Sequence, residues 1–316
     1  MSLQLTATRV AMRALERTAP QLGAALAERL FFTPPRAALT PQARDILATG
    51  QPFRVCVDEG RVAGWAWGHG PAVALVHGWG GRGGRLAAAF VAPLVASGFS
   101  VVTFDAPGHG VSDGRLSSMP QVARALRAVA DAAGSLYGIV AHSMGGSASA
   151  LAMAEGLEVE RAVFIAPAAD PARYAEAFAK LLFVGPTALA AMRRRSEARL
   201  RFRWSDLNVP RLAATLTTPL LIVHDRDDLT VPWEEGAAIA AAWAGAELVT
   251  TNGLGHRDIV RDPEIVARTV EFLRLSGVAA GSTPPCAVND EGAWVDRDLF
   301  ERDGRRRRLF GISDTQ

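Results

Sequence analysis

The sequence is poor in the features that build disulfide frameworks, metal sites and membrane spans. It has two cysteines, Cys56 and Cys286, which lie far apart and match no metal-binding spacing. Its uncharged apolar runs, such as residues 86–96, are too short to cross a bilayer. The net charge is +2, so charge gives no reason to expect nucleic acid as a partner. No internal repeat is visible. These absences favour a protein without metal, without stable membrane insertion and in a reducing, cytoplasmic environment.

The N-terminal region is the one place that leaves room for a secretory signal. Arg9, Arg13 and Arg17 precede an uncharged stretch, residues 18–27. Glu16 and the Pro20-Gln21 pair make this stretch poorly apolar, so a signal peptide is the weaker alternative.

The first 52 residues predict a helical extension, broken at Pro20 and again at Pro34-Pro35. Leu22, Leu26 and Leu30 recur every four residues and form one apolar stripe. We expect this extension to dock on the main body of the protein. A helix lying on a membrane surface is the alternative.

Residues 53–278 alternate between short apolar runs and helical patterns. The alternation predicts one large α/β domain with a mostly parallel, doubly wound sheet, and the 49% hydrophobic composition suffices for its core. The predicted strands are 53–57, 62–67, 72–76, 99–104, 137–141, 161–165, 219–224 and 247–251. The predicted helices are 86–96, 122–133, 144–157, 234–244 and 263–275. Asp58-Glu59-Gly60 indicates a hairpin between the first two strands.

Residues 168–218 interrupt this alternation with helical patterns, which predict an inserted cap over the C-terminal ends of the strands. The cap has an apolar cluster (Phe178, Leu181, Leu182, Phe183 and Val184), from which we expect Phe178, Leu182 and Phe183 to line an acyl pocket. An arginine-rich stretch follows (Arg193, Arg194, Arg195, Arg199, Arg201 and Arg203). We interpret the arginines as a solvated helix face, with steering of anionic substrates as the alternative.

The remaining segment, residues 279–316, is rich in Gly and Pro and carries four consecutive arginines at 305–308. This composition is typical of a solvated tail. Contact with a nucleic acid or an acidic partner is a weaker possibility.

The stretch 137–146 carries the strongest signal for chemistry. A short apolar strand is followed at once by Ser143, with small residues at Ala141 and Gly145, and then by an Ala-, Met- and Gly-rich helix. Strand, serine and helix are the arrangement of a nucleophile elbow, in which a strained turn presents the hydroxyl at the end of the sheet. The usual pattern is G-x-S-x-G, and Ala141 is a small departure from it.

Four further motifs fall, with this one, at the C-terminal ends of predicted strands, where open α/β sheets bind ligands. They are His77-Gly78-Trp79-Gly80-Gly81, the 105–112 segment Asp-Ala-Pro-Gly-His-Gly-Val-Ser, the 224–232 segment His-Asp-Arg-Asp-Asp-Leu-Thr-Val-Pro, and Gly253-Leu254-Gly255-His256. In this order and context, the series closely resembles the α/β-hydrolase superfamily over about residues 53–276. The resemblance implies an α/β-hydrolase fold with helices on both faces of the sheet and a helical cap insertion.

The resemblance also implies roles for individual residues. Ser143 matches the nucleophile, His256 the general base and Asp228 the triad acid, by its spacing to Val231-Pro232. The backbone N–H groups of Trp79 and Met144 match the oxyanion donors. The chemistry needs such parts, because a serine hydroxyl requires a base and the imidazole requires a carboxylate to fix its tautomer.

Other residues near these motifs are expected to have structural roles or compete for a catalytic one. Asp225 and Asp227 compete with Asp228 for the role of the acid. We expect Asp105, His77 and His109 to organise loops near the site. His142 precedes the nucleophile and is expected to line or support the pocket. His69 and His224 receive no role.

A serine nucleophile points to acyl-transfer chemistry rather than to the family branches that use Asp. We therefore expect hydrolysis of a small-molecule carboxylic ester or thioester through an acyl-enzyme. C–C bond hydrolysis, acyl transfer and perhydrolysis on the same residues stay open, as does a non-catalytic ligand receptor. No cofactor is implied, since Gly78-x-Gly80-Gly81 lacks the Lys-Ser/Thr of a phosphate loop. The oligomeric state is left open.

Overall fold

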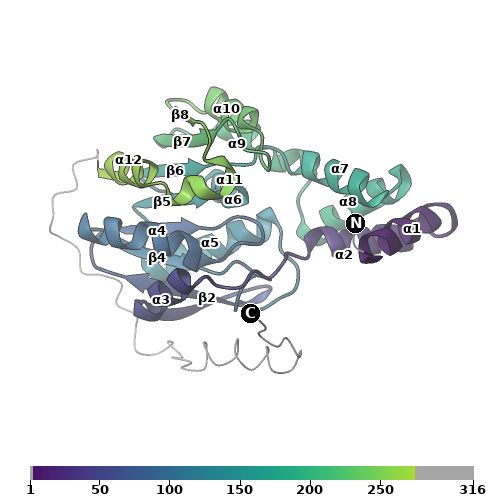
Figure 1. Ribbon diagram of the computed structural model, residues 1–316, viewed down its shortest axis with the longest axis horizontal. Coiled ribbons are helices and arrows are strands. Elements are labelled where there is room, and N and C mark those ends of the chain that lie inside the picture. Colours follow the sequence, from purple (N-terminus) through teal and green to yellow (C-terminus); the bar gives the residue numbers. More distant parts are fainter. Residues whose placement is uncertain (1–2, 275–316) are drawn as a thin grey trace.

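The computed structural model describes residues 3–274, which form an eight-stranded sheet with helices on both faces (Figure 1). The predicted tail at 279–316, with its arginine run, lies outside the described residues. The strand order is β1-β2-β4-β3-β5-β6-β7-β8. The strands are β1 (Gln51–Val57), β2 (Gly60–Trp67), β3 (Ala72–Val76), β4 (Ser100–Phe104), β5 (Gly138–His142), β6 (Arg161–Ile165), β7 (Leu220–Asp225) and β8 (Glu247–Thr251).

Pairing is antiparallel from β1 to β2 and from β2 to β4, and parallel through the rest of the sheet. Val57 pairs with Gly60, so the predicted hairpin at Asp58-Glu59 is confirmed. The mostly parallel α/β sheet predicted from the sequence is also confirmed. Its parallel strands end at one edge, and this edge carries the candidate site.

Successive residues of each strand face opposite sides and enter two separate cores. Along β3, Ala74 and Val76 join the core under one layer of helices, while Val73 and Leu75 join the other. The first layer contains α5 (Met119–Ala133), α6 (Met144–Ala154), α9 (Val209–Ala213) and α10 (Trp233–Ala242). The second contains α3 (Pro41–Thr49), α4 (Gly83–Ala96) and α12 (Pro263–Arg274).

The remaining helices differ from the expectation. Figure 1 shows α1 (Leu3–Thr18) and α2 (Pro20–Phe32) beside α7 (Pro171–Leu182) and α8 (Pro186–Leu200), away from the sheet. The helices α1 and α2 therefore pack on the cap, whereas α3 packs against α4 of the body. We call α1, α2, α7 and α8 the composite cap. Residues 209–213, expected in the cap, form α9 and pack on α6 and α10 instead.

Apolar packing and ion pairs hold the composite cap together. Met12, Ala24, Ala27 and Met192 are buried in its core. The buried carboxylate of Glu28 on α2 accepts hydrogen bonds from Arg195 and Arg199 on α8, at 3.1 and 2.8 Å. Part of the arginine-rich stretch thus joins α2 to α8, rather than forming only the solvated face that we expected.

Two further contacts position the composite cap. The N-terminus of α8 has no cap from its own segment, and Glu16 on α1 supplies one by accepting from the N–H groups of Thr187 and Ala188 at 3.0 and 3.1 Å. At the body side, the Tyr174 hydroxyl of α7 donates to the buried Glu235 of α10 at 3.1 Å. No helix within residues 3–274 is long and apolar enough to cross a membrane.

Candidate active site

Ser143 occupies the sharp turn between β5 and α6. Its φ of 56° and ψ of −128° are strained for a residue with a side chain, and its N–H donates to Ile165 O at 2.9 Å. The turn demands small neighbours: a Cβ on Gly145 would lie 2.4 Å from Val76 O, and one on Gly78 would lie 2.7 Å from the Ser143 Cβ. Ala141 is fully buried, so its methyl group is accommodated where the usual pattern has glycine.

A continuous line of hydrogen bonds joins Ser143, His256 and Asp228. The Ser143 hydroxyl lies 3.1 Å from His256 Nε2, and His256 Nδ1 lies 2.7 Å from Asp228 Oδ2. His256 is carried by α11 (Gly255–Asp258), which follows the loop after β8, and Asp228 by the loop after β7. The three residues predicted from separate motifs thus meet at one edge of the sheet.

The three aspartates after β7 have different partners. Asp225 accepts from the Thr251 hydroxyl at 2.7 Å and from Leu254 N–H at 3.1 Å. Asp227 is exposed and accepts from Gly253 N–H at 2.8 Å. Both therefore tie the loop after β7 to the loop that leads to His256, whereas Asp228 alone of the three faces the imidazole.

Asp228 is buried and held as a carboxylate. Its Oδ1 accepts from the N–H groups of Thr230 and Val231, both at 2.8 Å. Burial alone would raise the pKa of Asp228, but hydrogen bonding to His224, His256 and the backbone outweighs burial and lowers the pKa well below its ordinary value. Asp228 therefore stays charged at neutral pH and favours a proton on His256 Nδ1.

His224 is the residue that sequence reasoning missed. It is fully buried at the end of β7, its Nε2–H donates to Val231 O at 2.9 Å, and the same nitrogen lies 3.5 Å from Asp228 Oδ2. It fixes both ends of the short loop that carries Asp228. A polar residue ending a fully apolar strand was the available signal, because a buried imidazole needs a partner.

His142 contacts the backbone and the ring of His256. Its Nε2–H donates to His256 O at 2.9 Å, and the two rings lie 4.6 Å apart between centroids. Burial, and then the neighbouring His256, lower the pKa of His142 to about 3. His142 is therefore neutral at physiological pH and acts as a fixed hydrogen-bond donor to the loop of the candidate base.

The loop after β3, which carries Trp79, passes the elbow at Gly78. The N–H groups of Trp79 and Met144 have no acceptor among residues 3–274. His109 holds this loop, since its Nε2 accepts from Gly80 N–H at 3.0 Å, and burial lowers the pKa of His109 to about 3. A Cβ on Gly80 would lie 2.8 Å from Pro35, so the link from α2 to α3 runs directly past this loop.

Asp105 and His77 organise neighbouring loops, as expected. Asp105 is fully buried and accepts from the N–H groups of Gly83 and Val111, both at 3.0 Å. His77 donates through Nδ1 to Gly78 O at 2.8 Å and accepts from Ala106 N–H at 2.9 Å through Nε2. Burial is the main cause that lowers its pKa, so His77 is neutral and its two hydrogen bonds join the Trp79 loop to the loop after β4.

The three cap residues predicted to line an acyl pocket pack within the composite cap. Phe178 packs edge-on against Phe31 of α2, with 5.2 Å between ring centroids. Leu182 is buried in the core of the composite cap. Phe183 lies under the guanidinium groups of Arg9 and Arg13. These side chains pack α7 against the N-terminal helices, and their assignment to an acyl pocket stays a prediction.

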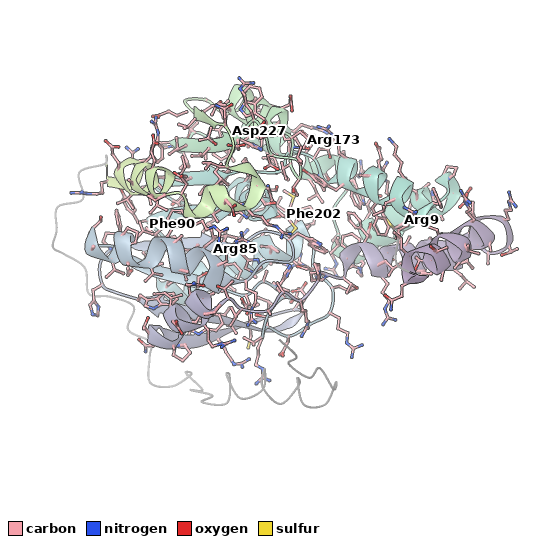
Figure 2. All side chains as sticks on the ribbon, viewed as in Figure 1. Arg9, Arg85, Phe90, Arg173, Phe202 and Asp227 are labelled. Carbon is pink, nitrogen blue, oxygen red and sulfur yellow. The ribbon has the colours of Figure 1, made fainter. Side chains whose placement is uncertain are left out.

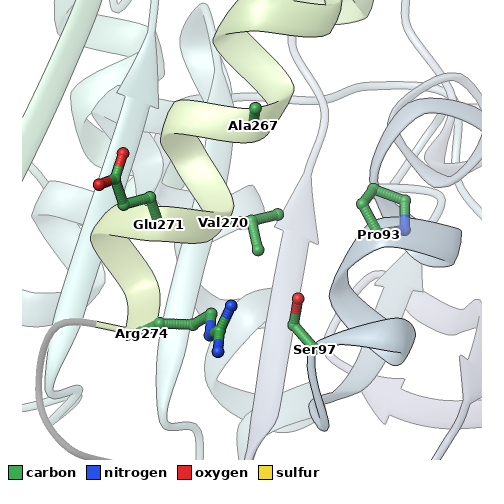
Figure 3. A pocket seen from close by; sticks show the side chains of 6 residues that line it. All are labelled: Pro93, Ser97, Ala267, Val270, Glu271 and Arg274. Carbon is green, nitrogen blue, oxygen red and sulfur yellow. The ribbon is translucent and has the colours of Figure 1, made fainter.

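Two surface hollows lie away from Ser143. One, of about 450 Å³, lies between α4 and α12 and is lined by Pro93, Ser97, Ala267, Val270, Glu271 and Arg274 (Figure 3). The other, of about 620 Å³, lies in the composite cap between α1, α7 and α8. Within residues 3–274, no group of three or more His, Cys, Asp or Glu side chains is arranged to hold a metal ion.

Comparison with known proteins agrees with this architecture. The family model described as "Alpha/beta hydrolase family" matches residues 73–269. A pimeloyl-[acyl-carrier protein] methyl ester esterase from Xanthomonas campestris pv. campestris is 30% identical over 246 residues, covering 64% of this chain and 94% of that protein. A serine hydrolase-like protein from Danio rerio is 33% identical over 106 residues, and the match spans 32% of its length.

Solved structures give the same fold. An esterase from Pyrococcus furiosus aligns with a TM-score of 0.59 and 20% identity, covering 77% of this chain and 98% of that one. An esterase from Exiguobacterium antarcticum aligns with a TM-score of 0.56 and 15% identity, covering 71% and 100%. At these identities the likeness establishes the fold alone.

Proposed function

The chain belongs to the alpha/beta hydrolase family, and from this premise we propose that it is a serine hydrolase that cleaves a carboxylic ester or thioester through an acyl-enzyme. One observation carries the proposal. The hydroxyl of Ser143 is in line with an imidazole and a buried carboxylate, at 3.1 and 2.7 Å, on a strained elbow.

In the first step, the Ser143 oxygen attacks the carbonyl carbon while His256 Nε2 takes the hydroxyl proton. The imidazole becomes positively charged, and the Asp228 carboxylate stabilises that charge through Nδ1–H. The former carbonyl oxygen becomes an oxyanion. We assign the N–H groups of Trp79 and Met144 to this oxyanion, where each donor is worth about 3–4 kcal/mol of the barrier.

In the second step, the tetrahedral intermediate collapses. The bond to the leaving oxygen or sulfur breaks, and His256 returns its proton to that atom, which releases an alcohol or thiol and leaves the acyl group on Ser143. Water then attacks the acyl-enzyme, with His256 again taking and returning a proton. The products are a carboxylic acid and the regenerated Ser143 hydroxyl.

Ester cleavage is the reaction that the comparison supports best. The Xanthomonas campestris relative, of which this chain covers 94%, is named as a methyl ester esterase. We expect side chains around Ser143 and the neighbouring segments, which include the Pro35 link beside Gly80, to select the acyl group and the leaving group. We propose a small-molecule acyl ester or thioester as the substrate class.

A covalent probe and a matched pair of variants test the proposal. A fluorophosphonate should label the wild-type protein at Ser143, and esters of graded acyl length should be hydrolysed. Ser143→Ala should abolish labelling and reduce hydrolysis by several orders of magnitude. Ser147→Ala is the control, because Ser147 lies one turn along α6 and donates to Ala168 O at 2.6 Å. Full activity of Ser143→Ala would refute the mechanism.

A further inference from the structure

The outer end of the composite cap exposes apolar side chains to solvent. Val10 on α1 is 62% exposed, Leu181 near the end of α7 is 52% exposed, and Phe183 just after α7 is 39% exposed. Figure 1 shows α1 and α7 at the end of the molecule farthest from β8 and α12, and Figure 2 places Arg9 on this end. An apolar cluster on a protruding end contributes nothing to the core of the body.

Direct contacts join Leu181 and Phe183 to α1, the helix that carries Val10 next to Arg9. Arg9 Nε donates to Leu181 O at 2.7 Å. The guanidinium carbons of Arg9 and Arg13 lie 4.9 and 4.0 Å from the centroid of the Phe183 ring. The apolar side chains of α7 are therefore flanked by cations of α1.

Phe183 adopts a conformation that a bulky residue rarely takes. Its φ of 57° and ψ of 37° are left-handed, at a helix end where glycine is usual. A residue in this region costs about 1 kcal/mol or more. The side chain is left 39% exposed even though it packs under Arg9 and Arg13. A strained and exposed aromatic residue points to use outside the fold.

The 620 Å³ hollow adjoins the same surface. Arg13, Arg17, Lys180 and Phe183 line it, together with apolar side chains such as Leu189. Its two acidic residues are already engaged. Glu16 caps α8, and Glu176 pairs with Arg193 at 3.1 Å. The lining thus combines three cations and two engaged carboxylates with apolar side chains.

We propose that this end of the molecule is a peripheral binding site for an anionic lipid surface. We call it the cap tip, and it comprises Arg9, Val10, Arg13, Arg17, Lys180, Leu181 and Phe183. The cations bind phosphate headgroups while Val10, Leu181 and Phe183 enter the boundary between headgroups and acyl chains. Protruding aliphatic side chains favour a lipid surface over an acidic protein, because a charged protein face would leave them without apolar partners. This proposal goes beyond hydrolysis and does not depend on it.

Vesicle co-sedimentation of the full chain tests the proposal. The wild-type protein should bind vesicles of phosphatidylglycerol mixed with phosphatidylcholine, should not bind phosphatidylcholine alone, and should be released by salt. Arg17→Glu combined with Lys180→Glu should lower the partition coefficient at least about thirtyfold, since each cation at such a surface contributes about 1 kcal/mol. Val10→Ser combined with Leu181→Ser should lower it about tenfold.

The control makes the same change of net charge on the body. Arg44→Glu combined with Arg268→Glu alters two exposed arginines on α3 and α12 and should leave vesicle binding within a few-fold of wild type. Circular dichroism verifies the fold of each variant independently of activity. Three results would overturn the proposal: no preference of the wild type for anionic vesicles, equal losses in the cap-tip and body variants, or binding of an acidic protein without binding of vesicles.

Discussion

Replacing Asp228 by asparagine should disable the imidazole without disturbing the loop. The N–H groups of Thr230 and Val231 both point at Oδ1, at 2.8 Å. They will hold the amide oxygen of Asp228→Asn at that position, so the NH₂ group takes the place of Oδ2 and faces His256 Nδ1. An NH₂ group can only donate here, so the His256 proton moves to Nε2, where it blocks acceptance of the Ser143 proton.

The expected loss is about four orders of magnitude in kcat, which corresponds to about 5.5 kcal/mol in the barrier. The neighbouring aspartates provide matched controls. Asp225→Asn weakens acceptance from Thr251 and Leu254, so it should lower stability by about 2 kcal/mol and kcat by less than about tenfold. Asp227→Asn keeps an acceptor for Gly253 at an exposed position, so both quantities should change little.

The assay is kcat on one water-soluble ester for all three variants, with urea unfolding measured in parallel. We expect Asp228→Asn to lose far more in kcat than in stability, and Asp225→Asn to show the opposite pattern. Near wild-type turnover in Asp228→Asn, with loss in either neighbour at unchanged stability, would refute the assignment of the acid.

Three further predictions concern the surroundings of the site. His224→Phe keeps a planar aromatic ring, one atom larger, but leaves Val231 O without its donor, so kcat should fall about tenfold with little change in KM. An unchanged kcat would show that the loop needs no such support. Acid should destabilise the fold, because burial, followed by a neighbouring histidine in each case, lowers the pKa of His109 and His142 to about 3. In the unfolded chain these histidines titrate at about pH 6.5, so below this pH the unfolded state binds more protons than the folded state. The free energy of unfolding should therefore fall by up to about 1.4 kcal/mol per histidine and pH unit below about pH 6.5. Urea unfolding at about pH 7 and about pH 5 measures this, and equal stabilities would contradict it. Glu28→Ala removes both ion pairs between α2 and α8 and should weaken their packing by about 2 kcal/mol; the loss is no larger because both arginines are partly solvated. Limited proteolysis should then cleave near the start of α2 faster than in the wild type.

The body of the protein could be predicted because its signals are local. Apolar runs of about five residues, each followed by a helical pattern, specify parallel strands and covering helices, since both faces of such a sheet are buried. The elbow followed from small residues around Ser143, because that turn admits no bulk. The motifs at the ends of the predicted strands also placed Ser143, Asp228 and His256 at one edge of the sheet. The catalytic roles of these residues stay predictions.

The sequence alone therefore determined the fold class, the strands and most helices of the body, and the residues proposed for the chemistry. Only the tertiary structure decided what depends on contacts across long separations. The pairing of α2 with α8 joins segments about 170 residues apart through Glu28 and its arginines, and no local pattern encodes such a contact. The same holds for Phe183, whose apolar character fits a pocket or a docked helix equally well. Its place was set by the arginines of α1, because packing partners, rather than periodicity, decide which apolar surface a helix covers.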